Sequence, residues 1–265
     1  MKGGFRLFYL LLLFLGAALG SFYHVVGYRM PIGENWVSDR SRCPGCGHQL
    51  TAIELMPILS YIIQGGKCRE CKMHIKPIYL LSEIVAGLLF VFPVWFYGFE
   101  GFETGHIFVA WAFLSMLIII TVSDIYYQLI LDKVLLFWGA IIVFLYVLYP
   151  QLDLMSALVS GVVGFLTLYV IGLLGQLLFK KEALGGGDIK LYAVVGFVLG
   201  IAPTFLSIFI ASGIALIYIL LFMKDKAKVI GFGPFIAMAS YICLFYGQSL
   251  LDWYFNLFVT IQPIK

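Results

Sequence analysis

Two aspartates stand at the edges of long apolar runs, where a charged side chain is costly and is therefore a functional candidate. Asp124 follows Thr121-Val122-Ser123, and Asp188 follows the three glycines Gly185–Gly187. If their carboxyl groups meet they share a proton, since two close carboxylates do not ionise together easily. The ionised group can take a proton from water that attacks a peptide carbonyl, while the protonated group polarises the carbonyl and then protonates the leaving amine. The pair therefore suits aspartic peptidase chemistry.

Each aspartate also has a simpler explanation. Asp188 could favour the positive end of a helix dipole, and Asp124 could be a solvated helix end. The glycines before Asp188 allow the backbone to approach a substrate strand or the other aspartate closely. Two further carboxylates at apolar edges, Glu83 and Asp132, are predicted to be structural and to pair with nearby Lys or Arg.

Four cysteines form two C-x2-C pairs separated by 21 residues, Cys43 with Cys46 and Cys68 with Cys71. Each pair offers two sulfurs on one side of a short turn, and two such turns close a tetrahedral thiolate shell around Zn²⁺. A full shell leaves no position for a reactive water, so we predict a structural zinc site that stabilises a loop too small for its own core. Four free thiols or two disulfides are the alternatives, and a reducing cytoplasm disfavours disulfides.

Other residues of metal-binding type are expected to be outside this site. Cys243 lies in the last apolar run and is predicted to be packing, and His48 and His74 are predicted to be loop histidines. The carboxylates and cysteines together also suit a different class of protein, a membrane ion or solute transporter with intramembrane carboxylates and a regulatory zinc knuckle. Transporters often repeat their topology between halves, and we find no such repeat here.

The composition identifies the environment of these residues. Of 265 residues, 62% are hydrophobic and 12% are charged, and the mean hydropathy is +1.02. Soluble domains carry roughly 25% charged residues, so this chain has too little polar surface to cover itself in water. A soluble enzyme, a disordered chain and a nucleic-acid binder are thereby excluded. The fold class expected is an all-α polytopic membrane protein.

Apolar runs predict about eight transmembrane helices and one small polar domain. A span needs about 20 apolar residues, and Pro203 is the clearest separator between the sixth and seventh runs. The predicted spans are 7–27, 78–98, 106–123, 133–149, 155–178, 189–203, 204–222 and 234–257. We therefore divide the chain into a first transmembrane helix (1–27), a cytoplasmic four-cysteine zinc-binding domain (28–76) and a transmembrane aspartic protease domain (77–265).

Lys and Arg mark the cytoplasmic side of a membrane protein. Threading eight spans places 14 of the 17 basic residues on the side of segment 28–76. They are Arg29, Arg40, Arg42, Lys67, Arg69, Lys72, Lys76, Lys133, Lys180, Lys181, Lys190, Lys224, Lys226 and Lys228. The zinc domain, Asp124 and Asp188 are thus predicted to face the cytoplasm, with both termini outside. Lys2 and Arg6 before a Leu-rich run are also typical of a signal peptide, but the seven basic residues of 28–76 favour a retained first helix.

A series of short motifs, in this order and topology, resembles the type IV prepilin peptidases, bacterial membrane aspartic proteases of the GxGD type. The resemblance runs from about residue 20 to 248. Besides the cysteine pairs, the motifs are Gly20-Ser21-Phe22, Tyr28-Arg29-Met30-Pro31, Pro57-Ile58-Leu59-Ser60-Tyr61, Asp124 followed by Asp132, Gly185-Gly186-Gly187-Asp188-Ile189-Lys190-Leu191, and Gly231-Phe232-Gly233-Pro234-Phe235. Leu131 and His24 depart from the pattern, which usually has proline and asparagine at these positions.

The resemblance implies that Asp124 and Asp188 are the catalytic aspartates and that the partners are membrane lipid and a prepilin or pseudopilin substrate. The family cuts the short basic leader of these substrates after a glycine, on the cytoplasmic side of the bacterial cell membrane. Members with the cysteine domain usually also methylate the new N-terminal residue with S-adenosylmethionine. The motifs do not place the residues that would hold this methyl donor.

Overall fold

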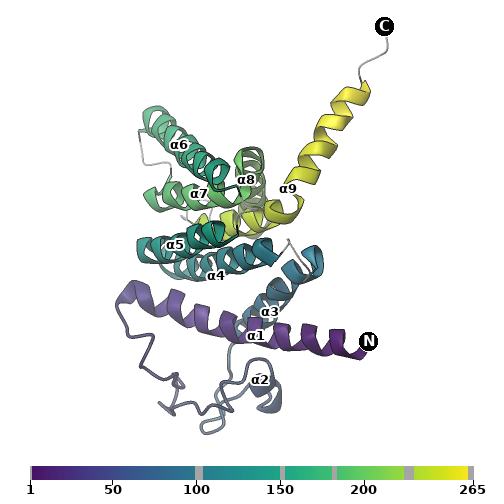
Figure 1. Cartoon of the computed structure of the whole chain (residues 1–265). Coiled ribbons are helices and arrows are strands. Elements are labelled where there is room, and N and C mark those ends of the chain that lie inside the picture. Colours follow the sequence, from purple (N-terminus) through teal and green to yellow (C-terminus); the bar gives the residue numbers. More distant parts are fainter. Residues whose placement is uncertain (1, 99–103, 150–152, 181–183, 224–229, 262–265) are drawn as a thin grey trace. The chain divides into compact units, whose positions relative to one another are not determined.

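The structure is a computed structural model, and it describes residues 2–98, 104–149, 153–180, 184–223 and 230–261. Within these residues the chain is helical apart from its loops (Figure 1). The long helices are α1 (Lys2–Arg29), α3 (Pro77–Tyr97), α4 (Thr104–Tyr127), α5 (Asp132–Leu148), α6 (Leu154–Phe179), α7 (Gly186–Leu199), α8 (Ile201–Phe222) and α9 (Gly233–Ile261). A 3-10 turn, η1 (Met30–Ile32), and a short helix, α2 (Leu59–Ile63), lie between α1 and α3.

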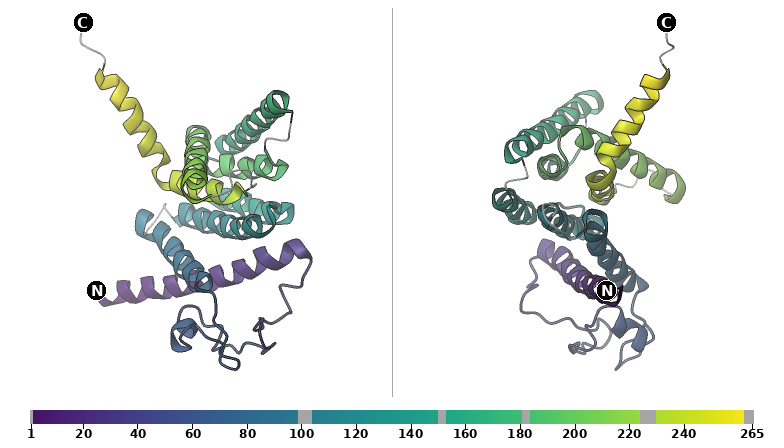
Figure 2. Two further views of the ribbon diagram at one scale, coloured as in Figure 1. Left: turned by 180° about the vertical axis from the view of Figure 1, so that it is seen from behind. Right: turned by 45° about the vertical axis from the view of Figure 1, so that its right-hand side comes forward.

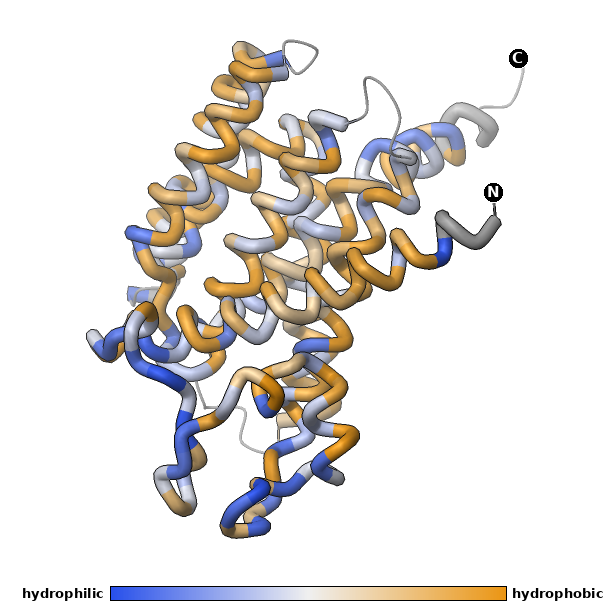
Figure 3. Tube along the Cα trace, turned by 60° about the horizontal axis from the view of Figure 1, so that its bottom comes forward, coloured by the Kyte–Doolittle hydropathy of each residue, from blue (hydrophilic) through white to orange (hydrophobic). Residues whose placement is uncertain are grey.

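Each predicted span corresponds to one of the long helices, which confirms the all-α membrane architecture. Among the described residues, six helices are long and apolar enough to cross a membrane: α1, α3, α4, α6, α8 and α9. The other two are short, with 17 residues in α5 and 14 in α7. Since a crossing takes about 20 residues, six of the eight expected spans are long enough to cross the membrane, and α5 and α7 are not. Figure 3 shows that the long helices are mainly hydrophobic, whereas the loop that contains the cysteines is mainly hydrophilic.

The boundary between the sixth and seventh predicted spans is not at Pro203. Helix α7 ends at Leu199, Gly200 adopts a φ of 83°, and α8 begins at Ile201. Glycine reaches this backbone conformation without the steric cost that a side chain brings. Pro203 lies in the first turn of α8, where a backbone N–H has no partner within the helix, so proline is tolerated there.

The chain forms two compact units, Met1–Ile107 and Phe108–Lys265. In the first, α1 and α3 pack through small residues: a Cβ on Gly87 would lie 2.7 Å from the carbonyl oxygen of Leu13, and a Cβ on Gly16 would lie 3.0 Å from Cγ of Phe90. Close approach of this kind is how helices associate in lipid. The loop between α1 and α3 belongs to the same unit and carries the four cysteines.

In the second unit α4 is the most buried of the six membrane-length helices, and Phe113, Met116 and Ile120 on it are fully buried. Helix α7 lies between α5 and α6 (Figures 1 and 2). It packs tightly on α6, because a Cβ on Gly161 would lie 2.9 Å from the carbonyl oxygen of Ala193. The basic residues Lys181, Lys224, Lys226 and Lys228, used above to predict orientation, lie outside the described residues.

Candidate active site and metal centre

Asp124 lies in the last turn of α4 and is 4% exposed. Its Oδ2 accepts a hydrogen bond from the backbone N–H of Gly233 at 2.7 Å. The chain turns sharply after α4: Ser123 Oγ donates to the carbonyl oxygen of Leu129 at 2.8 Å, and Gln128 adopts a left-handed φ of 52°. This turn fixes the end of α4 and with it the aspartate.

Asp188 lies in the first turn of α7 and is 9% exposed. Its backbone N–H donates to the carbonyl oxygen of Gly185 at 3.1 Å. Gly187, next to Asp188, lies against Ile130, six residues after Asp124, so the structure places these two predicted site residues in neighbouring segments although 64 positions separate them. Within the described residues neither carboxylate has an ion-pair partner.

The start of α7 is also fixed against the segment that follows α4. A Cβ on Gly187 would lie 2.7 Å from Cβ of Ile130, so only a glycine fits there without displacement. Lys190 Nζ donates to both carboxylate oxygens of Asp132, at 2.9 and 2.8 Å. The predicted pairing of Asp132 with a basic residue is confirmed, and the pair joins α5 to α7 two residues beyond Asp188.

Sequence reasoning assigned no role to two glycines that shape this site, Gly231 and Gly233. A Cβ on Gly231 would collide with the Asp124 carboxylate, and one on Gly233 would lie 2.9 Å from its Oδ2. The signal available was Pro234, because proline favours the first turn of a helix. Pro234 marks the start of α9, and the first backbone N–H groups of a helix need an acceptor outside the helix.

The arrangement of α4, α7 and α9 can perform acid–base chemistry. Two nearly buried carboxyl groups, neither of which forms an ion pair within the part of the chain that the structure describes, lie in segments close to one another. Such a pair can hold one proton between its members and exchange it with a water or a peptide group.

The four predicted metal ligands also come together. Their Sγ atoms all lie within 4.8 Å of one another, with 3.7 Å between those of Cys43 and Cys71 and 3.9 Å between those of Cys46 and Cys68. A tetrahedron of sulfurs about 2.3 Å from a zinc ion has edges of roughly 3.8 Å. All four are free thiols rather than disulfides. The sulfurs can therefore hold a metal ion.

The two cysteine pairs sit in equivalent turns. The N–H of Gly47 donates to the carbonyl oxygen of Cys43, and the N–H of Lys72 donates to that of Cys68. Gly47 and Lys72 adopt similar left-handed φ angles, 72° and 59°. Backbone N–H groups of Gly45 and Cys46 lower the pKa of the Cys43 thiol to about 7, and the thiolate is the form that binds metal.

His48 lies beside the cysteines but bonds elsewhere. Its Nε2 contacts Glu54 Oε2 at 3.1 Å, and the same oxygen accepts from the backbone N–H and the hydroxyl of Thr51, both at 2.9 Å. These groups, the Thr51 backbone N–H first, hold the pKa of Glu54 at about 2, and the bond to Glu54 raises the pKa of His48. His48 and His74 stand outside the group of possible metal ligands.

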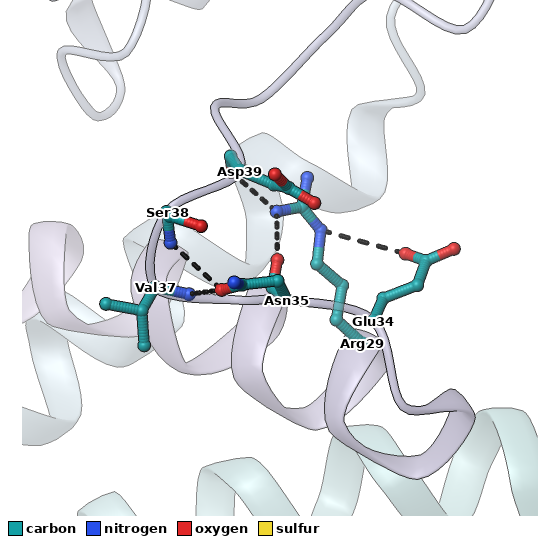
Figure 4. Close-up of polar contacts among 6 residues, drawn as sticks. All are labelled: Arg29, Glu34, Asn35, Val37, Ser38 and Asp39. Carbon is teal, nitrogen blue, oxygen red and sulfur yellow. Dashed lines mark hydrogen bonds and ion pairs between the residues drawn. The ribbon is translucent and has the colours of Figure 1, made fainter.

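Charged side chains of the membrane helices hold the loop at two points among the described residues. At the first, Arg29 donates to the carbonyl oxygens of Asn35 at 3.3 Å and Asp39 at 2.7 Å, and its Nε lies 4.0 Å from Glu34 (Figure 4). The Asn35 side chain accepts from the backbone N–H groups of the turn that follows (Figure 4). Arg29 therefore sets the direction in which the chain leaves α1.

At the second point, Glu83 of α3 holds a strained turn. Its carboxylate accepts from Ser21 Oγ at 2.9 Å and from the backbone N–H of Ile58 at 2.8 Å. Ile58 has a φ of 64°, and Leu59 N–H bonds to the carbonyl oxygen of Pro57 at 2.6 Å, which makes a γ-turn of the rare positive-φ kind. The predicted pairing of Glu83 with Lys or Arg is wrong, because a hydroxyl and a backbone amide take that place.

Comparison with known proteins identifies the family. The profile of the bacterial peptidase A24 N-terminal domain matches residues 14–97, and that of the type IV leader peptidase family matches residues 111–220. No solved structure matches the chain.

Curated relatives match over nearly the whole length. The prepilin leader peptidase/N-methyltransferase of Bacillus subtilis (strain 168) is 34% identical, over 93% of this chain and 98% of its own. Proteins with the same description from Stutzerimonas stutzeri and Pseudomonas aeruginosa are 32% and 30% identical, each over 93% of both chains. The chain belongs to the type IV leader peptidase family, peptidase A24.

Proposed function

We propose that this chain removes the basic leader of prepilins or pseudopilins and then methylates the new N-terminal residue. The peptidase and N-methyltransferase activities follow from relatives that span almost the whole chain. The observation that supports the peptidase activity in the molecule itself is that Asp124 and Asp188 are both nearly buried, in segments that contact each other through Ile130 and Gly187. The alternative of a transporter has no matching relative of comparable coverage among these proteins.

In this proposal Asp124 and Asp188 act as an aspartate dyad. The ionised carboxylate removes a proton from a water molecule, and the oxygen of that water forms a bond to the scissile carbonyl carbon. The protonated carboxyl polarises the carbonyl oxygen and later donates its proton to the leaving amine. The C–N bond then breaks, which leaves the carboxyl terminus on the leader and a free amine on the mature protein.

Asp124 lies in the last turn of α4 and Asp188 lies in the first turn of α7. Both residues are therefore on the same side of the membrane in the predicted topology. That side carries most of the Lys and Arg, which is typical of the cytoplasm. We infer that the dyad and the cysteine loop face the cytoplasm of a bacterial cell, where a basic leader is presented before cleavage.

We further infer that Cys43, Cys46, Cys68 and Cys71 hold one structural Zn²⁺. Their sulfur separations fit a tetrahedral zinc shell. Such an ion supplies folding free energy to the loop rather than a reactive water. The methyl donor of the second activity is S-adenosylmethionine, which provides the methyl group transferred to the new N-terminal amine.

The decisive experiment incubates the purified enzyme with a prepilin and measures both leader loss and the N-terminal mass. Wild-type protein should yield the shortened product and its methylated form. Asp124→Asn and Asp188→Asn should each abolish leader loss, and the double variant should be no worse, because residues that act as a unit are not additive. Near-normal cleavage by either single variant would overturn the dyad.

A further inference from the structure

One stretch of the cysteine loop, residues 52–66, is nearly free of charge, although the loop around it is rich in charged residues. Its only charged residue is Glu54, whose buried carboxylate is bonded to Thr51 and His48. Six large apolar side chains of the stretch are exposed, and we call them the apolar patch: Ile53, Leu55, Met56, Leu59, Ile62 and Ile63. An exposed apolar surface of this kind marks a contact with a membrane or with another protein.

The short helix α2 places half of the apolar patch on one of its faces. Leu59, Ile62 and Ile63 are spaced i, i+3 and i+4, so they are neighbours on the helix surface, and Ile63 is 78% exposed. The contacts that α2 makes within the loop use a different residue, since Tyr61 Oη donates to the carbonyl oxygen of Ile75 at 3.3 Å. The loop therefore folds around α2 and leaves the patch uncovered.

The hydrogen bonds of Glu83 show how far this stretch reaches along the membrane helices. Glu83 follows Lys76, the basic residue before α3, by seven residues, which is about 10 Å along the helix axis at 1.5 Å per residue. Its partner Ser21 precedes Arg29, at the end of α1, by eight residues or about 12 Å. Basic residues of this kind mark where a span leaves the membrane. Because the N–H of Ile58 donates to the Glu83 carboxylate at 2.8 Å, the turn before α2 lies inside this boundary.

The depth of this turn is that of a helix in the membrane interface. Helix side chains lean toward the N-terminus of their helix, so the Glu83 carboxylate lies somewhat nearer the surface than its Cα. An interfacial helix buries its apolar face about 5–10 Å into the boundary between headgroups and acyl chains. Figure 1 shows α2 level with the middle of α1, not beyond its C-terminal end. The apolar patch therefore stands at a depth where lipid is its natural surrounding.

The backbone of the turn is also suited to a place with little water, where every polar group of the backbone needs a partner within the protein. Pro57 has no N–H group. The N–H of Ile58 is bonded to the Glu83 carboxylate, and that of Leu59 is bonded to the carbonyl oxygen of Pro57 at 2.6 Å. The chain can therefore enter the interface here without an unpaired donor at these three residues.

We propose that residues 53–63 dock on the lipid bilayer, with the apolar patch in the membrane interface and the charged cysteine turns outside it. The patch continues the apolar surface of α3, on which Ile78 and Val85 are exposed, and this continuity favours lipid as the occupant. Lys67 and Lys72, which follow the patch and are exposed, would attract anionic headgroups at the same surface. Docking of this kind does not depend on the proposed peptidase activity, and cleavage is not part of its test.

The first test measures what surrounds the patch. A spin-labelled amino acid replaces Ile63 in the full chain, which is reconstituted in vesicles of phosphatidylethanolamine and phosphatidylglycerol. Molecular oxygen collects in hydrocarbon and a nickel chelate stays in water, so the relaxation that each causes reports the surroundings of the label. The control label replaces Arg40, an exposed residue in a charged part of the same loop. The label at position 63 should be open to oxygen and about tenfold better protected from nickel than the control, as expected for an interfacial helix.

Two other results at position 63 would overturn the proposal. Equal relaxation by nickel at positions 63 and 40 would place the patch in water. Protection of position 63 from both oxygen and nickel would show that protein covers the patch, either a second copy of this chain or another partner, instead of lipid.

The second test measures depth against α3. Labels at the exposed positions Ile78 and Val85, about 10 Å apart along the helix axis, serve as a ruler. A label at Leu59 should report a depth between these two, because the adjacent N–H of Ile58 is bonded to Glu83. Glu83→Ala should move this label toward water, whereas Glu83→Gln, which keeps an acceptor oxygen, should not. A label at Leu59 that is shallower than the one at Ile78, or that is unmoved by Glu83→Ala, would overturn the docking by this turn.

Discussion

The backbone N–H of Gly233 donates a hydrogen bond of 2.7 Å to Oδ2 of Asp124, 109 positions earlier in the chain. This bond joins the start of α9 to the end of α4. The first N–H groups of a helix have no acceptor within it, so the aspartate satisfies α9 while α9 fixes the orientation of the carboxylate. Gly231 makes the approach possible, since a side chain there would occupy the position of the carboxylate.

Gly233→Ala should lower prepilin cleavage by about 100-fold, because a displacement of about 1 Å at a reacting group has an effect of this size. The added Cβ would lie 2.9 Å from Asp124 Oδ2, and the carboxylate must shift. Initial rates of leader removal in membranes measure the effect. The matched control is Gly213→Ala in α8, where a Cβ meets nothing within 4 Å. Equal rates for the two variants would show that the position of the carboxylate is not critical.

Gly187→Ala should also impair cleavage strongly, for a different reason. Its Cβ would be 2.7 Å from Cβ of Ile130, which would push the start of α7, and Asp188 with it, away from α4. Gly186→Ala, with open space around its Cβ, should cleave normally. Ile130→Gly, which removes the contacting Cβ, combined with Gly187→Ala should restore much of the rate, as measured by leader removal. If the double variant is no better than Gly187→Ala, crowding by Ile130 is not the cause.

Much of this arrangement was predictable because it depends on local pattern. Apolar runs identified all eight long helices, and the spacing of Cys43, Cys46, Cys68 and Cys71 identified the sulfur cluster. The topology predicted that Asp124 and Asp188 can meet, since Asp124 near the end of one helix and Asp188 near the start of another both lie on the predicted cytoplasmic side.

The remaining features depend on contacts that no local pattern encodes. The hydrogen bond of Gly233 to Asp124 joins segments that are distant in the sequence. The carboxylate of Glu83 accepts hydrogen bonds from Ser21 and from the amide of Ile58 instead of pairing with a cation. The sequence prediction placed the break between α7 and α8 at Pro203 rather than at Gly200. Proline is the stronger sequence signal, whereas a glycine with positive φ is recognised only from the backbone. Helix α7 ends before its apolar run does, because Gly200 with its positive φ interrupts the run.

Purified protein should contain about one equivalent of zinc. Replacing any two of Cys43, Cys46, Cys68 and Cys71 by serine should remove the metal, because binding requires the full thiolate set. Metal analysis of protein prepared under reducing conditions gives the measurement. Cys243→Ser is the control and should keep the metal, since Cys243 is buried in α9 and does not belong to the group of possible metal ligands. A zinc-free wild-type preparation would contradict the assignment.

Glu54→Ala should loosen the cysteine loop without touching a sulfur. The carboxylate is buried, and its Oε2 accepts three hydrogen bonds, two from Thr51 and one from His48. Removing it leaves the Thr51 amide without its acceptor and frees the His48 ring, and outer groups of this kind typically change metal affinity about 10-fold or more. We expect faster trypsin cleavage at Lys67 and Arg69 and faster zinc transfer to a chelator. Glu34→Ala, which removes an exposed carboxylate 4.0 Å from Arg29, should alter neither rate. If both variants behave like the wild type, the sulfur cluster maintains the loop by itself, and the Glu54 contacts are dispensable.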